Sequence, residues 1–163
     1  MINIRFILLT GNKIYDCFYD DYNKHKAFMY SHTYSGNPLG ASLALEVLNI
    51  FKEDRVLKTI EEKGKFLNEK LKLALENHKN VGEIRSIGMI NAIEIVKDKK
   101  SKEAFNSQLR IGYNIYKEAL KRGLLLRPLG DVLYFNQLYI VSREDMDFMI
   151  EITKESIEYI LGK

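Results

Sequence analysis

Two short segments of this 163-residue chain hold the residue types most able to do chemistry. The first, residues 30–38 (YSHTYSGNP), places hydroxyl groups and an imidazole just before the expected start of a helix. Unpaired backbone N–H groups and the dipole at a helix N-terminus favour an anion, phosphate in particular. The alternative is a polar loop that only caps its own helix, which spacing alone favours because such loops are common.

The second segment, residues 124–130 (LLLRPLG), contains a single charged residue, Arg127. A guanidinium is costly to bury in an apolar strand unless it meets an anion, and its planar fork fits a carboxylate. Alternatively, Arg127 lies on a sheet edge, facing water or a surface acid, and both interpretations stay open. Tyr134 and Tyr139 flank the next strand, where they line a pocket or, more commonly for tyrosines, pack in the core.

The sequence contains no motif for a zinc, nucleotide or serine-hydrolase site. No HExxH, P-loop, GxGxxG or GxSxG spacing occurs, and His25 and His78 stand alone among charged residues, where solvation is expected. Cys17 is the only cysteine, so an internal disulfide and a cysteine metal cluster are excluded. We expect it to pack inside a helix, and we predict no metal site.

Composition indicates a globular chain, with 46% hydrophobic and 29% charged residues. The net charge of +3 comes from 25 basic and 22 acidic residues mixed along the sequence, so no basic arm favours nucleic acid. The apolar run at residues 6–9 is too short for a signal or membrane segment. These features predict a cytoplasmic protein without nucleic-acid or membrane partners.

Three helices are expected in the first half. Asn12 caps residues 13–20, Asn37 caps residues 38–52 with Pro38 at the first position, and Asp54 caps a third helix. The second helix has an apolar stripe of Leu39, Leu43, Val47 and Ile50 or Phe51. The third has the strongest periodic pattern, with apolar or small residues at three–four spacing: Leu57, Ile60, Gly64, Leu67, Leu71 and Ala74. Its Glu/Lys face is expected to be solvated.

After Asn80 the pattern changes to a period of two. Residues 83–87 and 89–96 are predicted strands around Gly88, residues 106–122 a helix, and residues 124–127 and 132–135 two more strands. Gly123 ends the helix, and Ser142 with Asp145 begins a last helix as a capping box. The predicted fold class is α+β, with helices on one side of a small, mostly antiparallel sheet.

These segments, in this order and at this separation, resemble the C-terminal part of class III aminotransferases. Those enzymes use pyridoxal 5′-phosphate on a type I aminotransferase fold. The matching stretches are residues 26–28 (KAF), 32–40 (HTYSGNPLG), 81–90 (VGEIRSIGMI) and 127–135 (RPLGDVLYF). The likeness runs from about Leu8 to the end. It is strongest to the members that act in biotin biosynthesis with S-adenosylmethionine as the amino donor.

The resemblance implies two parts and several site residues. Residues 1–53 would be a remnant of the large cofactor-binding domain, with the phosphate loop and a connecting helix, and residues 54–163 the C-terminal small domain. Thr33 and His32 would face the cofactor phosphate of the neighbouring subunit. Arg127 would bind the carboxylate of the amino-oxononanoate substrate, with Tyr139 and Ser31 near that substrate. A dimer, or another homo-oligomer, and small-molecule amino donor and keto acceptor are the implied partners.

The resemblance also implies an absence. The family's cofactor-binding lysine would lie upstream of Met1, so no catalytic residue is assigned in this chain. We expect the fragment alone to be inactive and not to retain the cofactor. Tyr30-Ser31 replaces a His-Gly pair of the family and Gln137-Leu138 a Pro-Pro pair, so the pocket wall and its selectivity differ. The alternatives are a fragment of an ω-amino acid aminotransferase, a non-catalytic assembly partner and the product of a broken reading frame.

Overall fold

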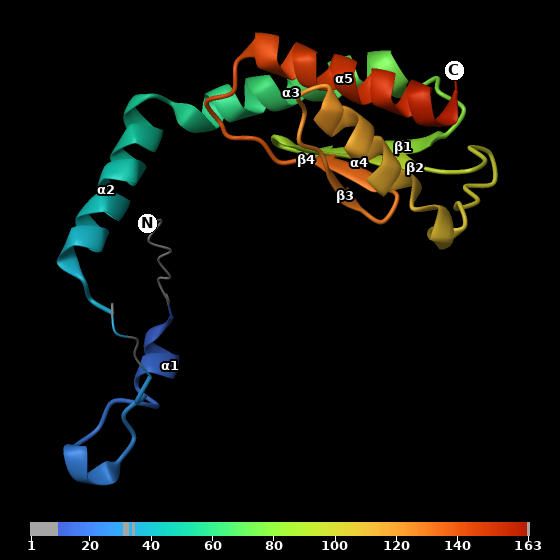
Figure 1. Ribbon diagram of the computed structural model, residues 1–163. Coiled ribbons are helices and arrows are strands. Elements are labelled where there is room, and N and C mark those ends of the chain that lie inside the picture. The colour runs from blue at the N-terminus through green and yellow to red at the C-terminus, as the bar shows by residue number, and fades with distance from the viewer. Residues whose placement is uncertain (1–9, 31–32, 34, 163) are drawn as a thin grey trace. The chain divides into compact units, whose positions relative to one another are not determined.

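A computed structural model describes residues 10–30, 33 and 35–162. The chain divides into two units, Met1–Asp54 and Arg55–Lys163, and Figure 1 labels their elements. Within the described residues, no helix is both long and apolar enough to cross a membrane.

Over its described residues, 10–30, 33 and 35–54, the first unit contains two short helical turns and one long helix. They are α1 (Asn12–Tyr15), the 3-10 turn η1 (Tyr22–Lys24) and α2 (Pro38–Glu53). The helix expected over residues 13–20 is therefore only four residues long, because α1 buries none of its side chains and a short helix needs tertiary packing to persist. Cys17 follows α1 and is exposed, so the prediction that it packs inside a helix is wrong.

Helix α2 begins as its sequence predicts. Asn37 is the N-cap, its side-chain oxygen accepts a hydrogen bond from the Leu39 N–H at 3.1 Å, and Pro38 takes the first helical position. The apolar stripe of this helix is exposed in the structure, at Leu39, Leu43, Val47 and Ile50. The periodic pattern therefore identified a helix face that the described chain leaves uncovered.

The boundary between α2 and α3 (Val56–Leu75) differs from the prediction. Asp54 ends α2 instead of capping α3, and Arg55 lies between the helices with a left-handed φ of 50°. A left-handed residue interrupts the helical hydrogen-bond ladder, so α2 and α3 are separate helices with Asp54 and Arg55 between them.

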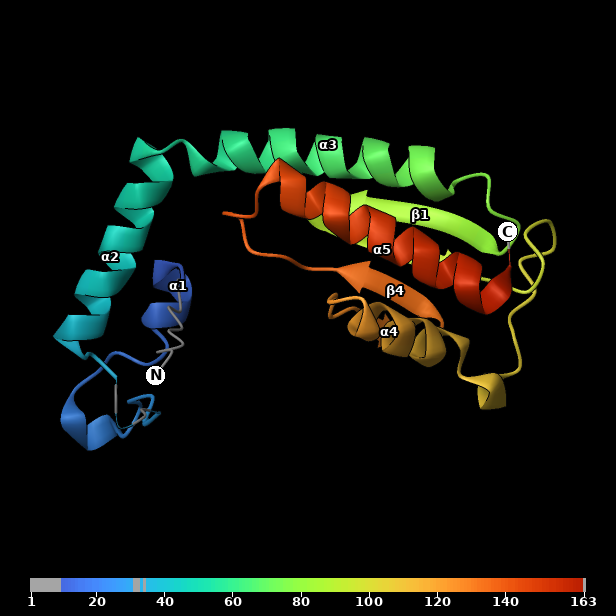
Figure 2. The ribbon, with the colours of Figure 1, turned by 45° about the horizontal axis from the view of Figure 1, so that its top comes forward.

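The second unit is a four-stranded sheet with helices on one face. The strands are β1 (Val81–Ile87), β2 (Ile90–Ile95), β3 (Arg127–Leu129) and β4 (Val132–Phe135), in the order β1-β2-β4-β3, and every neighbouring pair is antiparallel. Helices α3, α4 (Ile111–Lys121) and α5 (Arg143–Leu161) cover one side of the sheet, and α3 and α5 lie side by side (Figure 2). This arrangement confirms the predicted α+β fold.

The core lies between these helices and the sheet. Alternate residues of the central strands, such as Ile93 and Leu133, point into it. Burying a Leu or Ile side chain contributes about 1.5–3 kcal/mol. The largest of the fully buried apolar side chains are Leu67, Leu71, Leu75, Ile93, Ile115, Leu133, Met146 and Ile157. The opposite face of the sheet carries charged, aromatic and aliphatic residues of the same strands, among them Arg85, Tyr134 and Val132.

Two glycines let the helices approach the hairpin turns. A Cβ at Gly64 of α3 would lie 2.3 Å from the Gly88 carbonyl oxygen in the β1–β2 turn. A Cβ at Gly112 of α4 would lie 2.2 Å from the Gly130 carbonyl oxygen in the β3–β4 turn. Both turn glycines have positive φ, as tight hairpins require. The distance between helix layer and sheet is thus set at both ends by backbone contacts.

Two boundaries in the second unit are shifted from the prediction. The helix expected over residues 106–122 is a 3-10 turn, η2 (Ser107–Leu109), followed by α4, because Arg110 adopts a left-handed φ of 48° between them. The strand expected over residues 124–127 starts only at Arg127, since the Leu124 N–H still donates to the Ala119 carbonyl at the end of α4. Arg127 therefore begins the strand instead of ending it.

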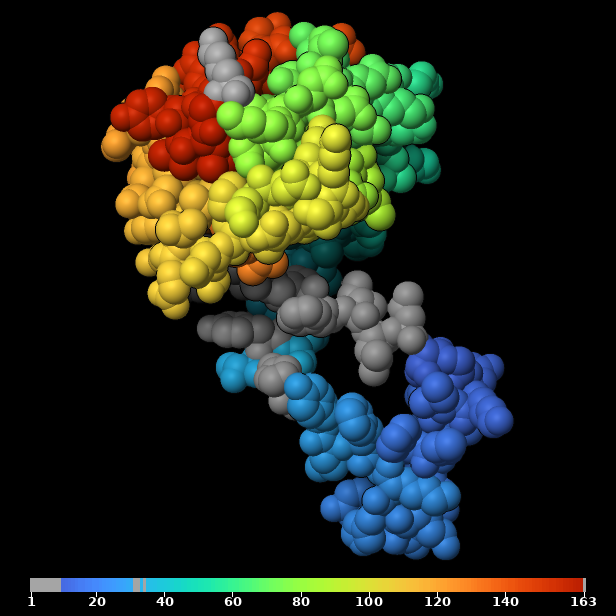
Figure 3. Space-filling model, turned by 90° about the vertical axis from the view of Figure 1, so that its right-hand side faces the viewer, coloured from blue at the N-terminus to red at the C-terminus, as the bar shows by residue number. Residues whose placement is uncertain are grey.

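Local capping also fixes the last helix. Ser142 and Asp145 form the predicted capping box at the start of α5. At the other end, the His78 ring nitrogen Nε2 lies 2.9 Å from the Gly162 carbonyl oxygen, so His78 connects the end of α3 to the end of α5 and is not simply solvated. Figure 3 shows this end of the unit, with the C-terminal part of α5 in red beside the green end of α3.

Candidate functional site

The first predicted site segment lies in the first unit. Thr33 is exposed, and its hydroxyl makes no hydrogen bond to a residue that the structure describes, so this donor is available to an external anion. The other predicted residues of the segment, Ser31 and His32, lie outside the described residues.

The N-terminus of α2 offers few free donors. Pro38 has no N–H, and the Leu39 N–H donates to the Asn37 side chain. The loop therefore caps its own helix, which is the simpler of the two interpretations of this segment. A hydrogen bond to an anion near this loop would come from groups such as the Thr33 hydroxyl.

Arg127 lies at the start of the edge strand β3, opposite Tyr134 in the register of β4. Its guanidinium carbon is 5.8 Å from the centre of the Tyr134 ring, within the range of a cation–π interaction. Arg127 is exposed, and no carboxylate among the described residues lies within 4.0 Å of it. The side chain is thus placed by the ring while its hydrogen-bonding fork stays available.

The other arginine of this sheet face has its partners inside the fold. The register aligns Arg85, Ala92, Tyr134 and Arg127 in one row across the four strands. One guanidinium nitrogen of Arg85, Nη1, lies 3.1 Å from a Glu83 carboxylate oxygen and 2.7 Å from a Glu94 carboxylate oxygen. The row therefore begins with a neutralised guanidinium and ends with one that has no ion-pair partner among the described residues.

The pKa of Glu83 is consistent with the ion pairing of Arg85 inside the fold. A hydrogen bond from Arg85 and the positive charge of Lys102 hold the pKa of Glu83 below its usual value. Lys102 lies 3.5 Å from Glu83 as well, so both basic groups near this carboxylate stabilise its ionised form. Arg85 is committed to structure, and Arg127 is the candidate for a ligand.

Tyr139 lies in the segment of residues 136–141 that joins β4 to α5, and its side chain is half exposed. Because Arg127 pairs with Tyr134 near the end of β4, Arg127 and the start of this segment lie at the same end of the sheet. The Tyr139 carbonyl accepts a hydrogen bond from the Lys63 amine at 2.8 Å. No sequence pattern indicated Lys63, which stands on the helix face expected to be solvated.

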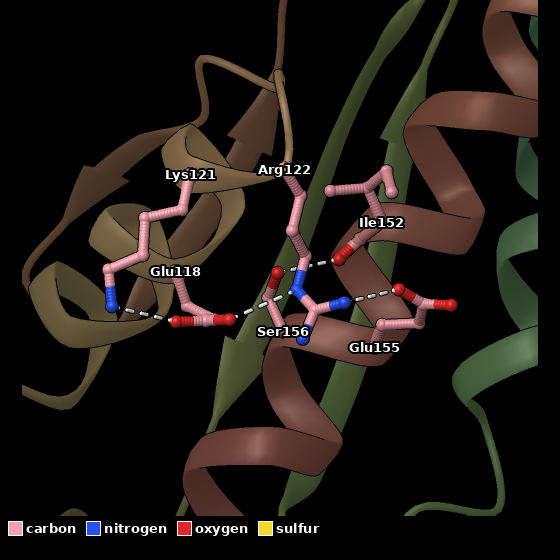
Figure 4. A network of polar contacts seen from close by, with 6 residues as sticks. All are labelled: Glu118, Lys121, Arg122, Ile152, Glu155 and Ser156. Carbon is pink, nitrogen blue, oxygen red and sulfur yellow. Dashed lines mark hydrogen bonds and ion pairs between the residues drawn. The ribbon is translucent and has the colours of Figure 1, made fainter.

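A second cluster of charges joins α4 to α5 (Figure 4). Glu118 is buried and forms ion pairs of 3.1 Å with Lys121 and with Arg122, and Arg122 reaches Glu155 of α5 at 2.7 Å. Bonds from Lys121 and Arg122 lower the pKa of Glu118, although its burial opposes this. Each carboxylate oxygen of Glu118 has its own cation, so this cluster holds two helices together and offers no reactive group.

The described residues contain no group of three or more His, Cys, Asp or Glu side chains arranged to hold a metal ion. Thr33 belongs to the first unit, and Arg127, Tyr134 and Tyr139 belong to the second. Within the second unit the structure brings Arg127 and Tyr134 together and places Tyr139 on the segment that follows them.

Comparison with known proteins agrees with these features. The model of the family "Aminotransferase class-III" matches residues 9–157. The chain is 38% identical over 154 residues to the adenosylmethionine-8-amino-7-oxononanoate aminotransferase of Geobacter sulfurreducens, covering 94% of this chain and 34% of that protein.

Solved structures show the same relationship. The adenosylmethionine-8-amino-7-oxononanoate aminotransferase of Methanocaldococcus jannaschii matches 93% of this chain with a TM-score of 0.85 and 29% identity. An (S)-enantioselective omega-transaminase of Thermomicrobium roseum matches 83% with a TM-score of 0.77 and 31% identity. The chain covers 34% and 30% of these two proteins, respectively, so it spans about a third of the length of its relatives. The chain belongs to the class III aminotransferase family.

Proposed function

We propose that this chain supplies the substrate-carboxylate contact and a cofactor-phosphate contact of an aminotransferase that transfers an amino group from S-adenosylmethionine to 8-amino-7-oxononanoate in biotin biosynthesis. The observation that supports it most is the Arg127 guanidinium, exposed and without a carboxylate partner among the described residues. The names of the relatives from Geobacter sulfurreducens and Methanocaldococcus jannaschii support this choice of substrates.

Arg127 suits a carboxylate for a geometric reason. Two parallel N–H groups of a guanidinium match the two oxygens of a carboxylate, and each charge-assisted hydrogen bond contributes about 1.5–3 kcal/mol. The Tyr134 ring at 5.8 Å restricts the orientation of the guanidinium, so less side-chain entropy is lost when a substrate binds. The half-exposed Tyr139 offers an apolar ring with a polar tip for the rest of the substrate.

Among the described residues of the segment 30–38, the exposed Thr33 hydroxyl is the donor that suits the phosphate of pyridoxal 5′-phosphate. Thr33 would hold that phosphate through its available hydroxyl, together with His32, and Ser31 would lie toward the substrate. The cofactor supplies reversible attachment of the amino group and an electron sink, which amino-acid side chains lack. We assign no lysine of this chain to cofactor attachment, and a polypeptide of these 163 residues would not catalyse transamination alone.

The substrate role of Arg127 can be tested in a hybrid enzyme. Residues 9–163 would replace the corresponding third of the Geobacter sulfurreducens relative, and Arg127→Ala would be compared with Arg85→Ala, the other arginine of the same sheet row. We expect Arg127→Ala to raise KM for 8-amino-7-oxononanoate by about tenfold or more, and Arg85→Ala to leave it within about twofold. Equal effects of the two substitutions would contradict the assignment.

The predicted inactivity of the 163-residue polypeptide has its own test. The purified chain is incubated with pyridoxal 5′-phosphate, reduced with borohydride and analysed by mass spectrometry. We expect no stoichiometric adduct. One adduct per chain at a single lysine would show that this chain does attach the cofactor.

A second candidate is an ω-amino acid aminotransferase, which the likeness to the Thermomicrobium roseum omega-transaminase favours. Competition between 8-amino-7-oxononanoate and an ω-amino acid in the hybrid enzyme separates the two candidates. The better substrate, measured by kcat/KM, identifies the activity.

We also propose that the chain associates with another copy or with an aminotransferase subunit. The first unit exposes a group of aromatic side chains, including the stacked pair Tyr15 and Tyr19 at 5.2 Å. Exposed apolar patches of this kind mark association surfaces. Other members are Phe18, Tyr22, Phe28 and Tyr30. A single monomeric species in sedimentation at micromolar concentration would contradict this proposal.

A further inference from the structure

The segment of residues 136–141 is held by hydrogen bonds to neighbouring elements. It is neither helix nor strand, and its three central side chains are all large and face solvent, with exposed fractions of 73% for Leu138, 48% for Tyr139 and 85% for Ile140. Core packing of these side chains therefore contributes little to the position of the segment. Its backbone must be held by other bonds.

Lys63 of α3 provides the strongest of these bonds. Its amine donates to the Tyr139 carbonyl at 2.8 Å and to the Val141 carbonyl at 2.6 Å. No carboxylate among the described residues lies within 4.0 Å of this amine. Hydrogen bonds from a charged donor are stronger than those between neutral groups. One cation thus holds the backbone on both sides of Ile140.

A second bond holds the beginning of the segment. The side-chain amide of Gln137 donates to the Met89 carbonyl at 3.0 Å, and Met89 is buried in the β1–β2 turn. The same turn contains Gly88, against which Gly64 of α3 packs without space for a Cβ. Lys63 and Gly64 are neighbours on α3. The helix therefore contacts both the segment and the turn, and Gln137 bonds the segment to the turn.

The start of α5 is fixed to α3 as well. The Phe66 ring lies 5.2 Å from the Lys70 amine and 5.2 Å from the Arg143 guanidinium carbon, and Lys70 pairs with Asp147 at 3.0 Å. Both ends of the segment therefore join elements that are immobilised against α3. Between them, the two carbonyls bonded to Lys63 hold the backbone from which the Tyr139 side chain projects.

We infer that Lys63 is a positioning residue, which holds the 136–141 backbone so that the Tyr139 side chain lines the substrate site next to Arg127. This inference rests on the proposed function for the role of Tyr139, and on the hydrogen bonds of Lys63 for the mechanism.

Amide hydrogen exchange of the 163-residue chain tests the positioning. The reporter amides are Val141, which donates to the Leu138 carbonyl at 3.1 Å, and Ser142, which donates to Asp145. Lys63→Met keeps an unbranched, slightly shorter side chain and removes its donors. We expect exchange of the reporters to accelerate about tenfold or more, as for the loss of a charged hydrogen bond, while the β2 amides stay protected.

Two further variants separate positioning from general effects. Lys65→Met changes an exposed lysine of the same helix that pairs with Glu61, and should leave the reporter amides unchanged. Lys63→Arg restores a charged donor and should recover most of the protection. Unchanged exchange in Lys63→Met, or equal acceleration by Lys65→Met, would overturn the inference.

Kinetics of the hybrid enzyme then test the consequence for substrate. Lys63→Met should raise KM for 8-amino-7-oxononanoate about fivefold with kcat within about twofold, and Lys63→Arg should reverse the change. Faster exchange with unchanged KM would refute the link to the substrate site. An inactive unmodified hybrid would contradict the proposed function, and the exchange result would still decide whether Lys63 positions the segment.

Discussion

The substitution Gly64→Ala tests the close approach of α3 to the β1–β2 turn. Two opposing effects set its outcome. Alanine is a better helix former than glycine by about 1 kcal/mol in a helix interior. However, the added Cβ would lie 2.3 Å from the Gly88 carbonyl oxygen and 2.8 Å from its carbon, more than about 1 Å inside ordinary contact distance for the oxygen.

The clash should prevail because both atoms belong to the backbone of a tight turn and cannot rotate away. Overpacking of this kind costs roughly 1–3 kcal/mol. We therefore expect the free energy of unfolding to fall by about 1–2 kcal/mol after the helix-propensity gain is subtracted. For the second unit, Arg55–Lys163, Tm would fall by roughly 4 °C for each kcal/mol lost.

The assay is urea denaturation followed by circular dichroism at fixed pH. Thr59→Ala, at an exposed position of the same helix, is the matched control and should stabilise the protein by about 0.5 kcal/mol. If Gly64→Ala stabilises the protein as Thr59→Ala does, α3 does not approach the turn closely. The support for residues 136–141 would then need another explanation.

Three further predictions concern the second unit. Gly112→Ala should also lower the free energy of unfolding by about 1–2 kcal/mol, since its Cβ would lie 2.2 Å from the Gly130 carbonyl oxygen, and an unchanged urea midpoint would refute this. Because its ion pairs lower the pKa of Glu118 in the folded state, they stabilise the protein above the ordinary carboxyl pKa of about 4.3, and this stability is lost as the pH falls through the lowered value. Glu118→Gln should flatten the decline of stability between about pH 5 and pH 3, while Glu151→Gln, which changes a carboxylate without an ion pair among the described residues, should retain the wild-type slope. Ser142→Ala should cost about 1 kcal/mol and accelerate amide exchange in the first turn of α5, and unchanged exchange there would contradict a working capping box.

The sequence determined the features that depend on near neighbours. The Asn37-Pro38 start of α2 and the Ser142–Asp145 box of α5 are confirmed because each is a bond between residues two or three positions apart. The hairpin at Gly88 follows for the same reason, since its positive φ is a local requirement. Period-two and period-3.6 patterns likewise predicted the α+β fold, because each element must bury one face.

Only the tertiary structure decided which charged residues are available. Arg85 and Arg127 are both single arginines of short strands, yet the register places Glu94 beside Arg85 and an aromatic ring beside Arg127. Lys63 stands on a helix face that the residue pattern predicts to be solvent-exposed. Its amine nevertheless donates a hydrogen bond to the Tyr139 carbonyl, 76 residues away in the sequence. Such partners follow from how elements distant in sequence pack, and a pattern of residue types along the chain contains no information on that packing.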